Sequence, residues 1–489
     1  MKRLWLVLLS LGLIVAFSTS AMAVDLKFSG EFYAAGMYQD KTNLCKDCGP
    51  STAFYFQRLR LNTVFVVAPG LTLTTRADIM ERSWGASRSN TLLGTPITGG
   101  PYNPALQGYA ANVASAGTVF ENENIAFDLA YVTYVSPIGI ISAGYQIDSA
   151  WGTVFGDNSI PTGKISYIYM KGPWTFIAQT GKNSAFNASG MFGIGGEQSY
   201  PRGTAIVPGL IDNSDLSDAD NTFYTLAARY SWNTGQAGFL YKYIRIATLR
   251  HPALAGLAYE DTIQIHVGIP YFKAQFGPVA VQSEIMYAFG NHNYESAWMK
   301  PWDGLVGADG RKAISVLNGW IDATADFDRF YFGGTFAYLS GQNPHVERQT
   351  QGVIDGGYDW NPTLILWNSD RNQWAGNLNG CSGTANTAMS NAYFYQVRGG
   401  VRPIDKIDIM ASVSYAHAVV KPTDAWAYNS YGWEVDLTGT YKITNNLSYM
   451  LGLGYLFTGD YFKGEADDLG FTGDVQNDFL VINKLTLTF

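Results

Sequence analysis

Residues 477–489 end the chain with the stretch N-D-F-L-V-I-N-K-L-T-L-T-F. From residue 479 onward its apolar and polar side chains alternate, with Ile482 and Asn483 as the two exceptions. The apolar positions are Phe479, Val481, Leu485, Leu487 and Phe489, and the polar ones are Lys484, Thr486 and Thr488. A period of two over this length predicts a β-strand with a different environment on each face.

The beginning of the chain has the features of an export signal. Lys2 and Arg3 precede an apolar run at residues 4–17, and Ala21-Met22-Ala23 forms a cleavage site. We therefore expect residues 1–23 to be a cleaved signal peptide. No later segment offers about 18 uninterrupted apolar residues, so a membrane protein built from helices is not expected.

The composition favours a lipid-facing barrel. The chain has 489 residues and a formal net charge of −8, with 40 acidic against 32 basic side chains, and this balance argues against nucleic acid as a partner. Aromatic residues make up 15% of the chain, charged residues only 15%, and there are 53 glycines. Two or three soluble β-domains are the alternative that the length allows.

Candidate strands recur along the whole chain. They lie at residues 24–38, 53–67, 70–80, 124–135, 139–147, 162–171, 173–182, 221–232, 235–248, 260–275, 278–290, 313–326, 329–341, 390–402, 406–417, 430–443, 446–458 and 477–489. The fold class is therefore all-β, a transmembrane antiparallel β-barrel of about 18 strands, with 16 as the alternative.

The connections between these strands alternate between short and long. The short ones are rich in turn residues and include Pro69, Pro137, Pro173, Pro278 and Pro403. The long ones include residues 81–123, 183–220, 291–312 and 342–389. Barrels of the outer membrane have short periplasmic turns and long outer loops, so this parity predicts the same threading, with both termini on the periplasmic side.

Alternation assigns a lipid face and a lumenal face to most strands. Leu59, Leu61, Phe127, Leu129 and Tyr131 are expected to face lipid. The side chains expected to line the pore are Arg58, Arg60, Arg76, Asp78, Asp128, Glu284, Arg398, Glu434 and Asp436. The strand at 235–248 carries charges in both phases and receives no assignment. An arginine facing lipid near the midplane costs roughly 2–4 kcal/mol, so these phases are constrained.

The signal peptide, the alternating connections and the terminal aromatic strand together resemble the bacterial outer-membrane porins. By strand number the chain resembles the eighteen-stranded substrate-selective or polysaccharide-export porins. In porins the outer loop after strand 5 folds into the lumen, and residues 148–160 contain a similar Gly-Phe-Gly-Asp-like segment, V-F-G-D. The resemblance implies a constriction loop that carries Trp151, Phe155 and Asp157. It also implies an outer-membrane location, insertion by the barrel-assembly machinery, contact with outer-membrane lipid and, by analogy, a homotrimer.

A tight turn at residues 68–70 sets the register of its two strands. Arg60 then lies opposite Asp78, and Asn62 opposite Arg76, which leaves Arg76 without a directly opposed carboxylate. Arg58, Arg60 and Arg76 would form a basic ladder facing acidic side chains across the lumen. The alternative is that these residues form ion pairs that stabilise the wall, and the two roles are compatible.

Three smaller features have open interpretations. Cys45 and Cys48 predict a loop disulfide, with a bond from either to Cys381 as the alternative. The aromatic loop at 342–389 is either packed on the rim or a sugar-stacking surface. The acidic group in the loop at 183–220 is either a solvated loop or a calcium site. It consists of Asp212, Asn213, Asp215, Asp218 and Asp220.

The function expected from these patterns is passive diffusion of small hydrophilic solutes with modest charge selectivity. The alternative is a barrel that encloses a partner such as an electron-transfer protein. An outer-membrane enzyme is less expected, because none of the five histidines lies in a hydrolase or metalloprotease motif. The sequence indicates no cofactor.

Overall fold

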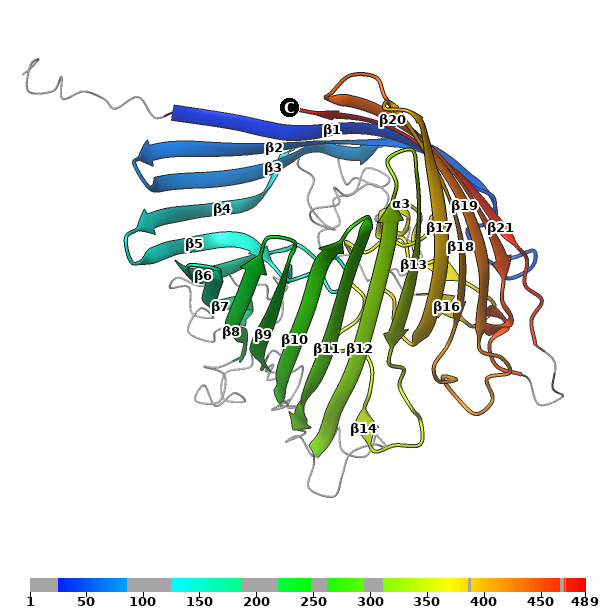
Figure 1. The fold of residues 1–489 in the computed structure, drawn as a ribbon. Helices are drawn as coiled ribbons and strands as arrows, with labels where there is room; N and C mark the ends of the chain where they lie inside the picture. Colours follow the sequence, from blue (N-terminus) through cyan, green and yellow to red (C-terminus); the bar gives the residue numbers. More distant parts are fainter. Residues whose placement is uncertain are drawn as a thin grey trace, which may run out of the picture.

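The computed structural model describes residues 25–85, 125–186, 219–247, 262–293, 311–385, 388–466, 470 and 472–489. Within these ranges, eighteen long antiparallel strands close into one barrel (Figure 1). They are β1 (Asp25–Gln39), β2 (Thr52–Ala68), β3 (Leu71–Ser83), β4 (Ile125–Ser136), β5 (Gly139–Asp148), β6 (Ile160–Lys171), β7 (Trp174–Phe186), β8 (Ala219–Trp232), β9 (Gly235–Ile246), β10 (Thr262–Phe276), β11 (Val279–Asn293), β12 (Arg311–Asp326), β13 (Phe330–Leu339), β17 (Ala392–Ile404), β18 (Ile407–His417), β19 (Ser430–Lys442), β20 (Leu447–Thr458) and β21 (Asp478–Thr488).

The predicted all-β barrel is confirmed, and the sixteen-strand alternative is wrong. Each predicted strand is present, with its ends within four residues of the predicted positions. The tight turn after β2 gives the predicted register, in which Arg60 pairs with Asp78 and Asn62 with Arg76. The signal peptide predicted at residues 1–23 and residues 212–218 of the acidic group lie outside the described residues.

The last strand closes the barrel. β21 pairs with β20 on one side and with β1 on the other, and the C-terminus lies beside β1 (Figure 1). The Gly30 N–H donates to the Phe489 carbonyl at 2.8 Å, and the Phe489 N–H donates back at 3.1 Å. A Cβ atom on Gly30 would lie 2.7 Å from the Phe489 ring, so glycine here leaves room for the terminal aromatic.

The turns at one rim are short because their residues adopt turn conformations easily. Gly70, Gly172 and Gly277 have φ of 76°, 57° and 58°, in the left-handed region that glycine adopts without steric cost. Asp328 in the β12–β13 turn has φ of 67°. The long connections leave from the opposite rim (Figure 1). This alternation matches the loop-length parity of the sequence.

The outward face of the wall is apolar, as a lipid-facing barrel requires. Phe127, Leu226 and Val397 are 71%, 62% and 65% exposed. The prediction for the second half of β4 is wrong, however. The β3–β4 register shifts between Arg76 and Ala77, so Asp128 is not paired with any residue of β3 in the register and forms a bulge. The bulge inverts the phase, so that Leu129 and Tyr131 turn inward while Val132 and Tyr134 face outward.

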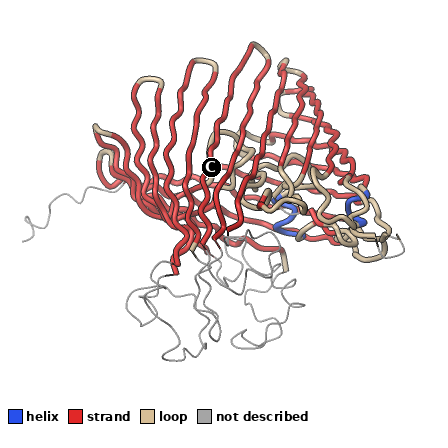
Figure 2. Tube along the Cα trace, turned by 90° about the horizontal axis from the view of Figure 1, so that it is seen from below, coloured by secondary structure: helices blue, strands red, loops and turns tan. Residues whose placement is uncertain are grey.

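The lumen contains the chain's own loops. The longest is the β13–β17 loop, residues 340–391, which includes β14 (Arg348–Gln349), α3 (Ser369–Ala375), β15 (Leu378–Asn379) and β16 (Thr384–Ala385). Figure 2 shows loop segments and short helices gathered within the curve of the wall. A second short helix, η4 (Asp460–Lys463), lies in the β20–β21 loop. In the part of the chain that is described, neither helix is long and apolar enough to cross a membrane.

Candidate functional site

An arginine wall, formed by Arg58, Arg60 and Arg76 on β2 and β3, lines one side of the lumen. Arg60 makes two hydrogen bonds to Asp78, with Nε–Oδ1 and Nη2–Oδ2 distances of 2.7 and 2.6 Å. Arg76 Nε donates to Asp128 at 2.8 Å across the β3–β4 bulge. Arg76 therefore does have a carboxylate partner, which the two-strand register did not foresee because the partner belongs to the next strand.

The arginine wall is neutralised by carboxylates. Arg58 lies 3.6 Å from both Glu31 and Glu81, and Arg60 lies 4.0 Å from Asp128 in addition to its bonds with Asp78. Four carboxylates thus accompany three guanidinium groups. The expectation of wall-stabilising ion pairs agrees with this geometry. The cluster faces the lumen, since Glu81 also accepts a hydrogen bond from Gln373 of the β13–β17 loop at 3.2 Å.

Glu284 on β11 holds the β5–β6 loop (149–159) against the inner wall. Its Oε2 accepts hydrogen bonds from the backbone N–H and the hydroxyl of Thr153, both at 2.9 Å. Gly152 and Gly156 leave room for it, since a Cβ on either would lie within 2.9 Å of a Glu284 oxygen. The contact joins two elements separated by 131 positions in the chain.

The three residues predicted for the constriction loop lie together in this docked segment. The indole N–H of Trp151 donates to the Ile269 carbonyl at 3.1 Å, and the Trp151 backbone N–H donates to Asp157 Oδ1 at 2.6 Å. Phe155 is fully buried and stacks on Trp320 of β12, with ring centroids 5.7 Å apart. The loop after β5 is therefore packed on the inner wall over β10 to β12.

Glu434 on β19 holds the β13–β17 loop against the inner wall, as Glu284 holds the β5–β6 loop. Its two carboxylate oxygens accept the backbone N–H groups of Leu364, Ile365 and Leu366 at 3.0, 2.6 and 2.8 Å. Glu434 is fully buried, so this carboxylate is covered by the loop rather than facing an open pore. Its neighbour Asp436 is 3% exposed and lies 3.4 Å from the Ser412 hydroxyl.

Arg398, also predicted to line the pore, forms a wall contact on β17. Its guanidinium binds both oxygens of Asp322 on β12, at 2.7 and 2.9 Å, and donates to Thr335 at 2.9 Å. This pair bridges across β13, so it ties three strands together.

The three tryptophans of the β13–β17 loop pack inside the barrel, whereas Tyr358 is exposed. Trp360, Trp367 and Trp374 are 8%, 3% and 8% exposed. Trp374 stacks on Phe56 of β2 at 4.5 Å, and Trp367 contacts Tyr431 of β19 at 4.9 Å. These rings belong to the largest buried apolar cluster, so neither rim packing nor a sugar-stacking surface describes them. Their burial depends on the loop folding inward, which no local pattern indicates.

The two inward loops are also bonded to each other. The Gly357 N–H donates to the Phe155 carbonyl at 2.6 Å, and the Asp359 N–H donates to the Asp157 carbonyl at 3.0 Å. The Tyr358 N–H donates to Asn158 Oδ1 at 2.9 Å. The structure inside the barrel is therefore formed jointly by both loops.

A cavity of about 370 Å³ lies between these loops and the inner wall of β5 to β11. One end holds a triad that the sequence analysis missed, in which Lys164 and Lys242 bond to Asp148 at 3.1 and 2.5 Å. The only local sequence feature that indicated this triad was the presence of charged residues on both faces of β9. Lys242 points inward while Tyr241 stacks against His266 on the outward face.

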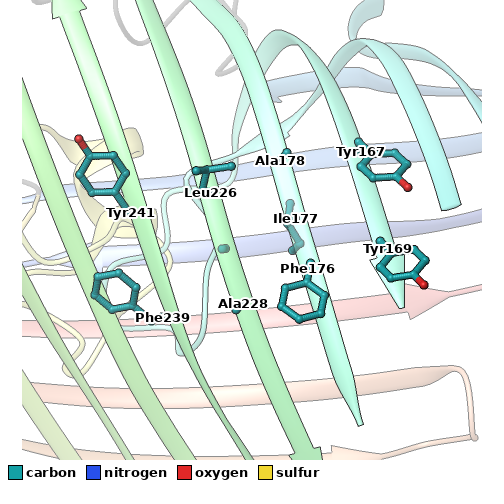
Figure 3. Close-up of a pocket in the computed structure, with 10 residues that line it drawn as sticks. Tyr167, Tyr169, Phe176, Ile177, Ala178, Leu226, Ala228, Phe239 and Tyr241 are labelled. Carbon is teal, nitrogen blue, oxygen red and sulfur yellow. The ribbon is translucent and has the colours of Figure 1, made fainter. Parts of the chain in front are cut away.

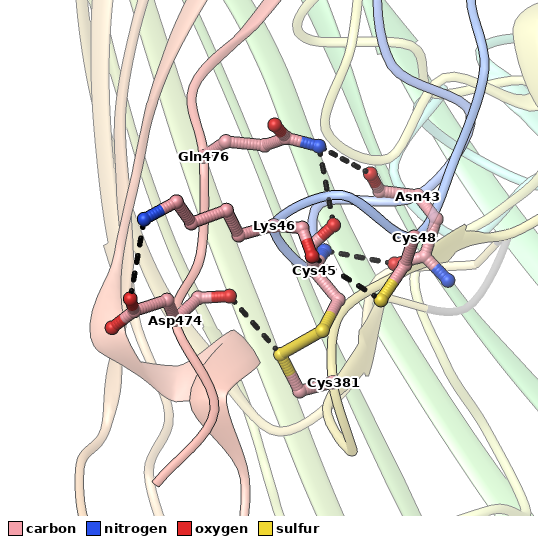
Figure 4. The surroundings of a disulfide bond; sticks show 7 residues. All are labelled: Asn43, Cys45, Lys46, Cys48, Cys381, Asp474 and Gln476. Atoms are coloured by element: carbon pink, nitrogen blue, oxygen red, sulfur yellow. Dashed lines mark hydrogen bonds and ion pairs between the residues drawn. A yellow bond between two sulfur atoms is a disulfide. The ribbon is translucent and has the colours of Figure 1, made fainter.

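The predicted Cys45–Cys48 disulfide is wrong. Cys45 is bonded to Cys381, 336 positions away, and Cys48 is an exposed free thiol (Figure 4). The first outer loop lies against residues 379–381 because the Leu44 N–H donates to the Asn379 carbonyl at 2.7 Å, and this contact brings the two sulfurs together. The disulfide ties the lumenal β13–β17 loop to the rim, as the alternative pairing with Cys381 had allowed.

The outer wall has a shallow apolar groove of about 580 Å³ over β6 to β9 (Figure 3). Aromatic rings of Tyr167, Phe176 and Phe239 surround the small side chains of Ala178 and Ala228. The groove belongs to the lipid-facing surface.

The described residues contain no cluster of three or more His, Cys, Asp or Glu side chains able to hold a metal ion. Of the predicted acidic group, Asp220 is described, and it forms an ion pair with Lys182.

Neither a protein-family model nor a curated protein matches this sequence. Solved structures do match. The outer membrane protein OpdK of Pseudomonas aeruginosa is 9% identical with a TM-score of 0.44, covering 95% of this chain and 99% of its own. A BenF-like porin of Pseudomonas fluorescens is 8% identical with a TM-score of 0.49 and the same coverage. OccK5 of Pseudomonas aeruginosa is 11% identical with a TM-score of 0.47, covering 95% and 98%.

The closed barrel with its apolar exterior is the form in which β-proteins cross the bacterial outer membrane, and lipid of that membrane surrounds it. The resemblance to porins expected from the sequence agrees with this architecture.

Proposed function

We propose that the protein is a passive outer-membrane channel for small hydrophilic solutes, with modest charge selectivity set inside the barrel. The observation that supports this most is the lumen itself. Two docked loops narrow an eighteen-stranded barrel around a cavity lined by charged side chains. An eighteen-stranded barrel is too wide for its wall side chains to fill, so its loops set the width of the pathway.

The proposal includes the threading of the chain. The short turns at Pro69, Pro137, Pro173, Pro278 and Pro403 would face the periplasm, and the long loops the outside. The barrel-assembly machinery would insert the protein, which would then form a homotrimer. The mass of the detergent-solubilised protein tests this oligomeric state. Epitope tags on intact cells test the threading, since surface labelling at the 68–70 turn would contradict it.

Single-channel recording in a planar lipid bilayer tests the function. We expect stepwise, passive conductance in potassium chloride, with a reversal potential in a salt gradient that reports the charge selectivity. A barrel that inserts without conducting would refute the channel. The alternative, a sheath around a partner protein, is less favoured because the chain's own β5–β6 and β13–β17 loops occupy the lumen.

A further inference from the structure

The cavity between the two inward loops contains carboxylates that form no ion pair with a described residue. Asp355 makes no hydrogen bond or ion pair with any described residue. Asp157 uses Oδ1 to accept the Trp151 N–H at 2.6 Å, and no described lysine or arginine lies within ion-pair distance of it. Both residues line the cavity.

Glu284 adds a buried oxygen without a partner. The residue is 1% exposed, and while its Oε2 binds Thr153, its Oε1 has no hydrogen-bond partner among the described residues. An unpaired buried oxygen of a carboxylate is costly, and a charged donor would satisfy it. Glu284 therefore leaves one carboxyl oxygen of the cavity wall without a partner, independently of the two aspartates.

The positive groups in the cavity are already paired. Lys164 and Lys242 both donate to Asp148, and the Lys242 ammonium also lies 4.2 Å from the centroid of the Phe223 ring. Apart from Glu284, the described lining thus holds three carboxylates, those of Asp148, Asp157 and Asp355, against two lysines. The cavity as a whole favours a cation.

The rest of the lining is apolar. Ile244, Val267 and Ile269 contribute aliphatic side chains from the inner wall, and Trp151 and Tyr358 contribute aromatic ones. Inward aliphatic side chains on adjacent strands are unlike a wall built only for water and ions. They provide contact area for a hydrocarbon body, and aromatic faces attract ammonium groups.

We propose that this cavity binds a small organic cation, an aliphatic primary ammonium ion, during its passage. The ammonium group would donate to Asp157 and Asp355, and the aliphatic body would lie against Ile244, Val267 and Ile269. The inference rests on the proposed channel function, whose solute class it narrows. A volume of about 370 Å³ lies within the range of small-molecule sites.

The protonation of the two aspartates makes the site dependent on pH. Burial raises the pKa of Asp355 to about 6. Burial also raises the pKa of Asp157 to about 6, against the hydrogen bond from the Trp151 N–H; Asp359 adds to the rise and Lys273 opposes it. Both carboxylates are mainly ionised at pH 7.5 and mainly neutral at pH 5, so binding of the cation should weaken on acidification.

Calorimetric titration of the full-length, detergent-solubilised protein with n-butylammonium chloride at pH 7.5 tests the proposal. Sodium butyrate and butanol are the probes matched in chain length. We expect saturable binding of butylammonium alone, weakened at least about tenfold in Asp355→Asn, because a hydrogen bond to a charged group is lost. Asp328→Asn, in an exposed turn at the opposite rim, removes the same charge and should bind as the wild type does.

The outcomes separate the site from the channel. Equal binding of butyrate or butanol, or unchanged binding in both Asp355→Asn and Asp157→Asn, would overturn the inference; the second variant covers a failure of the first to fold. Conductance without butylammonium binding refutes the site and leaves the channel. Binding without conductance keeps the site and refutes the channel.

Discussion

The arginine wall on β2 and β3 and the two glutamates that dock the inward loops use the same chemistry for different purposes. Arg60 and Arg76 meet carboxylates from neighbouring strands, so their pairs stabilise the wall. Glu284 and Glu434 instead accept backbone N–H groups of distant loops and are 1% and 0% exposed. Inward charge therefore does not by itself indicate a pore-lining residue, because some of these groups fix the loops that form the constriction.

Removing the Glu434 carboxylate should have the largest effect. Glu434→Gln replaces one of two accepting oxygens by an N–H₂ group that faces the backbone donors of residues 364–366, at a cost of about 3 kcal/mol in loop docking. We expect the barrel to assemble, the β13–β17 loop to become sensitive to protease, and single-channel conductance to rise. Glu31→Gln, which removes a wall carboxylate near Arg58, is the control. Equal protease resistance in the two variants would remove the distinction between the regions.

Glu284→Gln should have a smaller effect of the same kind. A glutamine can keep its oxygen on Thr153, so the loss is about 1 kcal/mol and is limited to the β5–β6 loop. We expect single-channel recordings of this variant to show increased current noise, while its heat-modifiable gel mobility, which reports barrel assembly, stays normal. Glu284→Ala, which loses both bonds, should exceed it. A reversed order would show that packing of Phe155 holds this loop without the carboxylate.

Arg76→Gln should change selectivity more than stability. Its pair with Asp128 is largely buried, but a glutamine can still donate to Asp128 and Arg60 lies 4.0 Å from that carboxylate, so we expect a loss of about 1 kcal/mol. The reversal potential should shift toward cation preference, and more strongly at 0.01 M salt, where the Debye length is about 30 Å. Asp128→Asn should shift it toward anions. If both variants left selectivity unchanged at low salt, the arginine wall would be structural only.

Acidification should give the smallest change. The pKa of Asp157 and that of Asp355 are raised to about 6 by burial, so lowering the pH from 7.5 to 5 neutralises two lumenal carboxylates and reduces cation preference. Because the folded state binds these protons more tightly than the unfolded chain does, stability should rise as the pH falls through 6 toward 4. In the Asp157→Asn, Asp355→Asn double variant, selectivity should be nearly flat over this range. If the selectivity of that variant still changed fully with pH, titratable groups other than Asp157 and Asp355 would cause the change.

Strand positions and one register were predictable because they depend on local physics. A period of two reports which side chains meet lipid, and a tight turn at residues 68–70 leaves one pairing for β2 and β3, including Arg60 with Asp78. The Asp128 bulge was not predictable in the same way. An extra residue changes the phase without changing the composition of the strand, so Leu129 and Tyr131 still read as lipid-facing.

The sequence by itself determined the barrel, its strand number and the parity of its connections, since each follows from neighbouring residues. Only the tertiary structure decided what fills the barrel. The inward course of the β13–β17 loop, the Cys45–Cys381 bond and the docking of loops on Glu284 and Glu434 join positions 68 to 336 apart. Such contacts are selected by the packing of whole elements within a closed wall, and a local pattern carries no record of which distant backbone will meet a given carboxylate or thiol.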